Sequence, residues 1–292
     1  MTAGGVTTER MPTPRDFEQW EPPPPARQPA WQGWRDRLGR HWLVVFSGLV
    51  LLYLFIPIIV TVLFSFNDNL GRFNFTWRGF TIEHWRNACG VPGLCPAMVR
   101  SLQVATIATI GATILGSLIA FALVRHRFRG RGPTNLALFL PMATPEIVMG
   151  TSLLALFLNL GMTRGFRTIV IGHIMFNISF VVVTVKARLQ GQDANLEEAA
   201  MDLYADEWTT FRKVTLPLAM PGIIAGALLA FALSFDDFVI TNFVSGNTVT
   251  FPMFVWGAAQ RGIPPQVNVM ATLMFAVALT AALVGLLGRR RT

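Results

Sequence analysis

The sequence predicts an all-α polytopic membrane protein with six transmembrane helices. Its 292 residues are 52% hydrophobic and only 14% charged, which excludes a water-soluble domain. Long uncharged apolar runs recur along the chain, and a helix needs about 20 mostly apolar residues to cross the hydrocarbon core. The placement of lysine and arginine between these runs then orients the helices.

The N-terminal segment has a different composition. Residues 1–30 are rich in proline and poor in aliphatic side chains, so they cannot form a core and are predicted to be disordered. Alternating tryptophan and arginine follow, which favours an interfacial segment before the first span. We therefore divide the chain into a tail with an interfacial segment at residues 1–40 and a transmembrane domain at residues 41–288. The interfacial residues are Trp31, Trp34, Arg35, Arg37, Arg40 and Trp42.

The apolar runs predict where each span lies. In chain order, the spans are expected at residues 42–66, 101–124, 134–160, 168–185, 221–244 and 267–287. The third is expected to break near its middle, because Pro141 and Pro145 interrupt it. The apolar piece TVTFPMFVWGA, which starts at Thr248, is too short to cross and is expected to be re-entrant or interfacial.

The basic residues orient these spans. With the N-terminus inside, 17 of the 24 lysine and arginine residues fall in cytoplasmic segments, and seven fall outside. Because cytoplasmic loops carry the excess of positive charge, both termini and the segment at residues 186–217 are predicted to be cytoplasmic. This topology also explains the net charge of +8, so the charge does not indicate nucleic-acid binding.

The charged segment at residues 186–217 reads as two short helices joined by a turn. Asn195 can cap the first helix, with Glu198 completing a capping box, and Asp206 can cap the second. Pro217 is expected to end the second helix. Each helix is too short to be stable alone in water, so another subunit is expected to cover the apolar faces. Those faces are Leu196, Ala199, Ala200 and Leu203 on the first helix and Trp208, Phe211 and Val214 on the second, while Glu197, Glu198 and Asp202 stay in water.

The spacing of Glu198-Ala199-Ala200 and Val214-x-Leu216-Pro217 resembles the EAA signature of ABC-importer permeases. The resemblance implies a type I (MetI-like) permease fold and a cytoplasmic coupling loop held by an ATPase subunit. Tyr204 stands where the family usually has glycine. A glycine would allow a positive φ there, which costs another residue about 1–2 kcal/mol. Either the turn is therefore built differently, or Tyr204 contributes a contact of its own. The implied coupling residues are Leu196, Glu198, Ala199, Ala200, Leu203, Tyr204, Phe211 and Pro217.

Three carboxylates fall inside the predicted spans. Glu146, Asp236 and Asp237 each cost about 2.5–3.5 kcal/mol on insertion scales, so they are expected to face protein or a water-filled path. No lysine or arginine lies within the spans to pair with them. A partner subunit or a cationic substrate is therefore expected to supply the positive charge.

The two aspartates differ in their predicted surroundings. On a continuous helix, Ser234, Asp237 and Thr241 form one polar stripe, whereas Asp236 falls on an apolar face. We therefore expect Asp237 on the substrate path and Asp236 at a helix or subunit interface. Glu146 has two interpretations, a direct role in the path or a favourable carboxylate at the start of a half-helix capped by Thr144.

The residues from Ala219 through LSFDDFVITNFVSG, and the later GIPPQVNVMAT, are similar to the PotC-type permeases of spermidine/putrescine importers. That family implies a bacterial inner membrane, a second homologous permease, two ATPase subunits that carry ATP and Mg²⁺, and an extracytoplasmic polyamine-binding protein. Phe235, Phe238 and Trp256 could then add cation–π contacts to the path. A permease for a metal ion, an organophosphonate or a sugar is the nearest alternative, followed by a transporter that works alone.

The sequence offers little support for nucleotide binding, metal binding or catalysis by this chain. No nucleotide-binding loop, metal-ligand spacing or nucleophile elbow occurs, so no catalytic residue, metal or cofactor is assigned to the chain. Cys89 and Cys95, the two cysteines, lie in the same predicted external loop, where they form either a disulfide or two free thiols.

Overall fold

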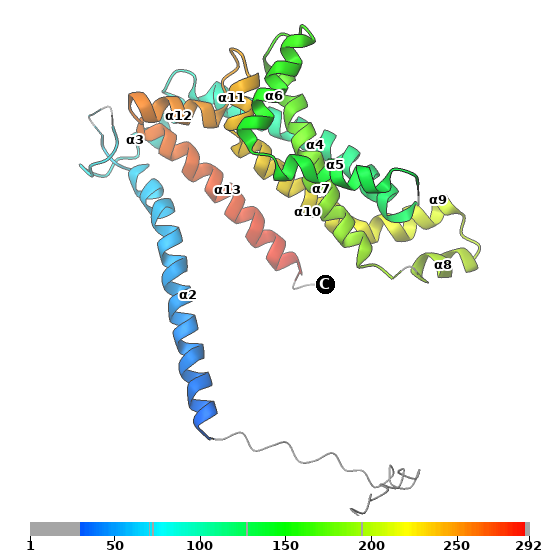
Figure 1. The fold of residues 1–292 in the computed structure, drawn as a ribbon. Coiled ribbons are helices and arrows are strands. Elements are labelled where there is room, and N and C mark those ends of the chain that lie inside the picture. Colours follow the sequence, from blue (N-terminus) through cyan, green and yellow to red (C-terminus); the bar gives the residue numbers. More distant parts are fainter. Residues whose placement is uncertain (1–29, 70, 72, 127, 194, 290–292) are drawn as a thin grey trace, which may run out of the picture. The chain divides into compact units, whose positions relative to one another are not determined.

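Figure 1 shows the computed structural model, which describes residues 30–289 apart from residues 70, 72, 127 and 194. Side chains at residues 30–41, 286, 288 and 289 also lie outside this description, as does the tail predicted to be disordered. The chain divides into two compact units, Met1–Ile59 and Val60–Thr292. Most of helix α2 (Ala30–Phe64) belongs to the first unit, and every later helix belongs to the second.

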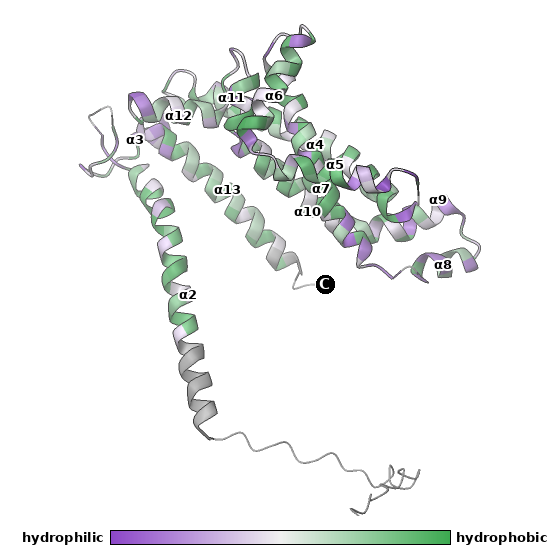
Figure 2. Cartoon of the chain, in the orientation of Figure 1, coloured by the Kyte–Doolittle hydropathy of each residue, from purple (hydrophilic) through white to green (hydrophobic). Residues whose placement is uncertain are grey.

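The described part of the chain confirms the all-α membrane fold. Five helical runs are long and apolar enough to cross a bilayer, and Figure 2 shows their hydrophobic character. A bent helix pair gives a sixth candidate span. The five are Trp42–Phe64, α4 (Leu94–Arg125), α7 (Phe166–Gln190), the run Glu207–Asp236, and Pro265–Gly285 within α13 (Pro265–Arg289).

The fourth span is longer than the short segment predicted at residues 168–185. Helix α7 continues through two basic residues, because each finds a polar partner at the end of a neighbouring helix. The Lys186 ammonium donates to Asn135 Oδ1 at 2.7 Å, and Arg188 Nε donates to the Leu218 carbonyl at 3.0 Å. Long basic side chains can thus extend an apolar helix beyond its hydropathy boundary.

Helices α4, α7 and α10 (Leu216–Asp236) form the centre of the second unit. Small residues recur every four positions along α10, at Gly222, Gly226, Ala230 and Ser234, and all four are buried. A Cβ added to Gly222 would lie 2.5 Å from Cβ of Arg188. The small stripe therefore lets the α7 and α10 backbones approach closely, which is how helices gain packing energy inside a membrane.

The third span is broken, as predicted, but by a sharp bend. Helices α5 (Arg131–Ala143) and α6 (Glu146–Asn159) meet at 109°. Thr144 was expected to cap α6; instead its hydroxyl donates back to the Leu140 carbonyl at 2.7 Å, so it closes α5. Pro145 occupies the N-cap of α6. The residue before a proline is pushed out of the helical region, which ends α5 at this point.

The fifth span was predicted as one helix over residues 221–244, and this is wrong. Helix α10 ends at Asp236, and a separate short helix, α11 (Val239–Val244), follows. Helix α12 (Phe251–Arg261) comes next and has 11 residues, so the piece beginning at Thr248 is indeed too short to cross. The Phe251 N–H donates to the Ser101 hydroxyl at 2.8 Å and ties α12 to α4.

The second helix of the charged segment does not end at Pro217. Helix α9 (Glu207–Thr210) passes through a π-helical turn, η1 (Phe211–Thr215), directly into α10. The Leu216 N–H reaches back to the Phe211 carbonyl, five residues earlier. This wider turn accommodates the proline ring, which would collide with a carbonyl four residues back in a regular α-helix.

The segment between α2 and α4 is held by local contacts. It contains the short helix α3 (Glu83–Arg86), a disulfide between Cys89 and Cys95, and a buried amide network around Asn67. Asn67 donates to Asn74 Oδ1 at 2.6 Å, and its own Oδ1 accepts from the Arg78 N–H at 2.8 Å.

Candidate functional site

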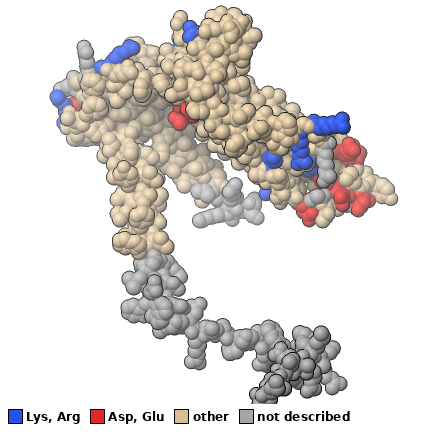
Figure 3. Space-filling view, viewed as in Figure 1, with Lys and Arg blue, Asp and Glu red and all other residues tan. Residues whose placement is uncertain are grey.

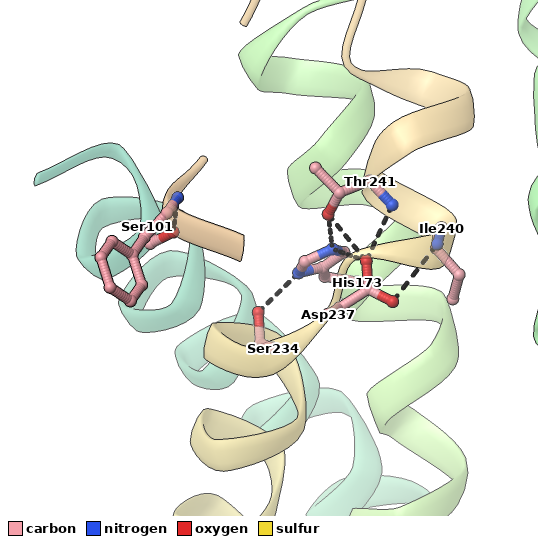
Figure 4. A network of polar contacts seen from close by, with 7 residues as sticks. Ser101, His173, Ser234, Asp237, Ile240 and Thr241 are labelled. Carbon is pink, nitrogen blue, oxygen red and sulfur yellow. Dashed lines mark hydrogen bonds and ion pairs between the residues drawn. The ribbon is translucent and has the colours of Figure 1, made fainter. Parts of the chain in front are cut away.

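The break between α10 and α11 is surrounded by a network of four polar side chains (Figure 4). His173, buried on α7, contacts the Ser234 hydroxyl through Nδ1 at 2.6 Å and the Thr241 hydroxyl through Nε2 at 2.9 Å. Asp237 Oδ2 lies 3.2 Å from the same Nε2. The imidazole thus joins residues on both sides of the break.

Asp237 determines where α11 begins. Its Oδ2 accepts hydrogen bonds from the Thr241 N–H (2.8 Å) and hydroxyl (2.7 Å), and its Oδ1 accepts from the Ile240 N–H (3.3 Å). These are donors of the first turn, which a capping carboxylate satisfies. The Asp237 side chain is only 7% exposed, so its partners belong to this chain.

Asp236, by contrast, is exposed and lines an open cavity of about 400 Å³. Aromatic rings form much of its wall. Phe238 and Trp256 lie 5.2 Å apart between ring centroids, and the Trp256 side chain is 56% exposed. The cavity therefore combines one carboxylate with open aromatic surface. The remaining lining residues are Phe235, Phe251, Pro252, Val255 and Ala259.

The surroundings of Asp237 differ from the prediction because it is buried, whereas Asp236 lies among mostly apolar residues, as predicted. The helical wheel required a continuous helix, and the backbone leaves the helix at Asp237, where φ and ψ are −63° and 122°. Ser234 and Thr241 do lie together with Asp237, but as partners of His173 in a buried network. Asp236 faces the cavity that contains Trp256.

His173 was not assigned a role from the sequence. Its partners lie 61 to 68 residues away along the chain, so no local pattern connects them. The available signal was an ionisable side chain within an apolar span, which marks a polar partner or a functional site.

Glu146 does not join this network. It opens α6, is exposed, and is absent from the lining of the Asp236 cavity. A carboxylate in the first turn interacts favourably with the positive end of a helix. The geometry of Glu146 thus fits the half-helix interpretation, and its role in a substrate path stays a prediction.

The charged segment folds into two short helices, as predicted. Helix α8 (Asn195–Asp202) exposes Leu196, Ala199 and, just beyond its end, Leu203, which is 82% exposed; Ala200 is half-buried. The cap differs from the prediction, because Asp193 Oδ1 accepts from the Asn195 N–H at 3.0 Å. Large apolar side chains thus face solvent on a helix of two turns, which is typical of a surface that a partner covers.

Tyr204 adopts the left-handed conformation that the glycine of the EAA signature would allow. Its φ is +61°, and it is the one non-glycine residue with a positive φ in the described chain. The side chain is 98% exposed, so no packing within this chain offsets the strain of about 1–2 kcal/mol. The turn is therefore not built differently, and the exposed Tyr204 side chain is free to make a contact of its own with a partner.

The second helix of the segment starts where it was predicted. Asp206 occupies the N-cap of α9, and a hydrogen bond from the Thr209 side chain lowers the pKa of its carboxyl. Phe211 packs edge-on against Phe121 of α4, with ring centroids 5.4 Å apart. The apolar face of α9 and η1 is thus partly covered within this chain, whereas Trp208 remains exposed.

Glu197 was expected to stay in water, and this is wrong. It forms an ion pair with Arg125 at the end of α4 and accepts a hydrogen bond from Thr215. The other carboxylates of the segment remain at its surface, where Figure 3 shows acidic side chains gathered around α8 and α9. Among the described residues, no three histidine, cysteine, aspartate or glutamate side chains are grouped to hold a metal ion.

Comparisons with known proteins agree with this architecture. The family model described as "Binding-protein-dependent transport system inner membrane component" matches residues 112–290. Among solved structures, a bacterial ABC transporter that imports the acidic polysaccharide alginate superposes with a TM-score of 0.62 at 17% identity, over 87% of this chain and 97% of that one. The MetNI methionine ABC transporter gives 0.54 at 16% identity, over 68% and 93%. At these identities the likeness shows the fold alone.

Curated relatives match over most of the chain. The spermidine/putrescine permease PotC of Escherichia coli K12 is 41% identical over 257 residues, which cover 87% of this chain and 97% of PotC. PotC of Haemophilus influenzae is 39% identical, over 84% and 95%, and the putrescine permease PotI of Escherichia coli K12 is 37% identical, over 80% and 85%. The chain therefore belongs to the binding-protein-dependent transport system inner membrane components, and within them to the PotC-type permeases of ABC importers.

Proposed function

We propose that this protein is a permease subunit of an importer for polyamines such as spermidine and putrescine. The observation that carries the proposal is the 41% identity to a spermidine/putrescine permease across nearly the whole of that relative. The cavity at the α10–α11 break supports it. A polyamine presents ammonium groups along a flexible apolar chain, and the cavity offers one carboxylate, Asp236, beside the partly buried ring of Phe238 and the exposed ring of Trp256.

The proposed complex contains further subunits. A homologous permease would complete the translocation path, an extracytoplasmic binding protein would deliver the polyamine, and two ATPase subunits would bind ATP and Mg²⁺. Exposed Leu196 and Leu203 on the coupling segment support an ATPase contact there. This chain itself supplies the path and the docking segment, without a catalytic residue.

Uptake of radiolabelled spermidine and putrescine tests the substrate directly. Cells that lack this chain should lose uptake, and restoring the chain should recover it. Unlabelled polyamines should compete, whereas a metal ion, an organophosphonate or a sugar should not. If the deletion leaves polyamine uptake unchanged and abolishes uptake of one of those other solutes, that solute would replace the polyamine as the substrate.

We also propose that both termini and α8 face the cytoplasm, from the excess of lysine and arginine in those segments. Helix α10 has 21 residues and so rises about 30 Å, at about 1.5 Å per residue. Asp236, at its far end, then lies near the external mouth of the path.

Thiol labelling of the only two cysteines tests this orientation. A membrane-impermeant maleimide should not react with Cys89 or Cys95 on intact cells, because the two form a disulfide. After treatment with an impermeant reductant, both should react. In a cysteine-free variant, Asn195→Cys should react only after the cells are permeabilised. Labelling of Asn195→Cys on intact cells would reverse the orientation, and labelling before reduction would exclude the disulfide.

A further inference from the structure

An ionic contact joins α8 to two membrane helices that are far apart in the sequence. Arg125 ends α4, Glu197 lies in the first turn of α8, and Thr215 ends η1 at the base of α10. Arg125 Nη1 pairs with Glu197 Oε2, and the Thr215 hydroxyl donates to Glu197 Oε1 at 2.5 Å. Arg125 Nη2 also lies 3.4 Å from the Thr215 hydroxyl oxygen. One carboxylate therefore holds both helix ends.

These three side chains are shielded from water. Thr215 is buried, and the Arg125 and Glu197 side chains are 30% and 20% exposed. Water and salt weaken an ion pair less when it is partly buried than when it lies on an open surface. The contact of Glu197 with Arg125 and Thr215 is thus better suited to fix the position of α8 than contacts of the other charged residues of the segment, which lie at the surface.

Helix α8 packs against α9 and η1, but it lies across a cavity from the ends of the other helices. An open cavity of about 320 Å³ lies between α8 and the ends of α4, α7 and α10. Leu196 and Glu197 are the residues of α8 that line it. Across this cavity, the polar contact of Glu197 links α8 to Arg125 and Thr215.

Thr215 connects this contact to the site at the other end of α10. The π-helical turn η1 runs without interruption into α10, whose last residue is Asp236. A displacement of α8 that moves Glu197 would therefore also move the base of the helix that presents Asp236. Arg125 would carry the same displacement to α4, which packs against α7 and α10.

We propose that Arg125, Glu197 and Thr215 are positioning residues that transmit movement of α8 to α4 and α10. The inference rests on the proposed function, in which α8 docks on an ATPase subunit. Docking supplies the displacement, and the Glu197 carboxylate makes the two helix ends follow it. Without this contact, α8 can remain bound to the ATPase while the membrane helices no longer follow its movement.

Uptake per ATP hydrolysed, measured with the complete complex in proteoliposomes, tests this. Glu197→Gln removes the charge and keeps the shape, so the ratio should fall about five-fold while the ATPase subunits stay associated. Arg125→Glu should lower it at least as much, because two carboxylates then face each other. Combining Arg125→Glu with Glu197→Arg restores opposite charges and should recover about half of the ratio or more.

Thr215 gives a matched pair of variants. Thr215→Ser keeps the hydroxyl and should behave like the unchanged protein, whereas Thr215→Val keeps the volume and should lower the ratio about three-fold. A residue that acts only in folding would change the amount of complex and leave the ratio of uptake to hydrolysis unchanged.

Three results would overturn the inference, and two of them concern variants that assemble. One is a normal ratio in Glu197→Gln and Thr215→Val; the other is no recovery in the charge-swapped pair when its complex assembles normally. Failure of every variant to assemble would assign the contact to folding, and would overturn it too. Failure of the proposed function is separate, because the unchanged complex would then take up no polyamine or would not retain its ATPase subunits.

Discussion

Asp236→Asn is expected to lower polyamine uptake about ten-fold or more, while the amount of permease in the membrane stays normal. Asp236 is exposed in the cavity beside Phe238 and Trp256, and no described side chain of this protein neutralises it. A hydrogen bond to a charged group contributes about 1.5–3 kcal/mol. Because about 1.4 kcal/mol is a factor of ten, losing one ammonium–carboxylate contact accounts for that decrease. Uptake of radiolabelled spermidine, normalised to membrane protein, measures it.

Asp237→Asn is the matched control, because it makes the same change one residue away. Oδ2 now accepts hydrogen bonds from the Thr241 N–H and hydroxyl. The new amide either turns its own N–H groups toward these two donors or offers them a neutral carbonyl in place of the carboxylate. We therefore expect less assembled permease, with near-normal uptake per molecule. The opposite pattern, normal uptake in Asp236→Asn and a transport defect in assembled Asp237→Asn, would assign the substrate contact to Asp237.

The features that could be predicted from the sequence are the local ones. Apolar runs gave the spans, and the Lys/Arg distribution gave an orientation that remains to be tested. Capping residues and short apolar stripes predicted α8, the turn after it and the start of α9, and the spacing of the EAA signature placed Tyr204 at the position of the family glycine. Each depends on residues within a few turns of one another.

The features that could not be predicted depend on distant partners. The helix break at Asp237 has no proline or glycine beside it, and the imidazole that joins the residues on its two sides, His173, lies 64 residues from Asp237. A wheel drawn through the break consequently grouped Ser234, Asp237 and Thr241 correctly, but it did not show that they are buried around His173. Glu197 likewise follows the pattern of a solvated residue, and its partner Arg125 comes from another helix. The π-helical turn before Pro217 also involves a distant contact, because Phe211 in that turn packs on Phe121 of α4.

Leu203→Asp is expected to abolish most transport without affecting the fold of this chain. Leu203 is 82% exposed and lies beside the strained Tyr204, so a polar side chain there disturbs no internal packing. If this surface docks on an ATPase subunit, the variant buries an unpaired carboxylate in the interface, which costs several kcal/mol.

The expected result is loss of the ATPase subunits during purification and uptake below about a tenth of normal, because a cost of about 3 kcal/mol weakens association by about two powers of ten. Met201→Asp is the control. It places the same charge two residues earlier, in the last turn of α8, away from the face formed by Leu196 and Ala200. That variant should keep most of its ATPase and most of its uptake. Equal loss in both variants would mean that added charge on α8, and not this face, disturbs the complex. Full association of Leu203→Asp with the ATPase would place the docking surface elsewhere on the chain.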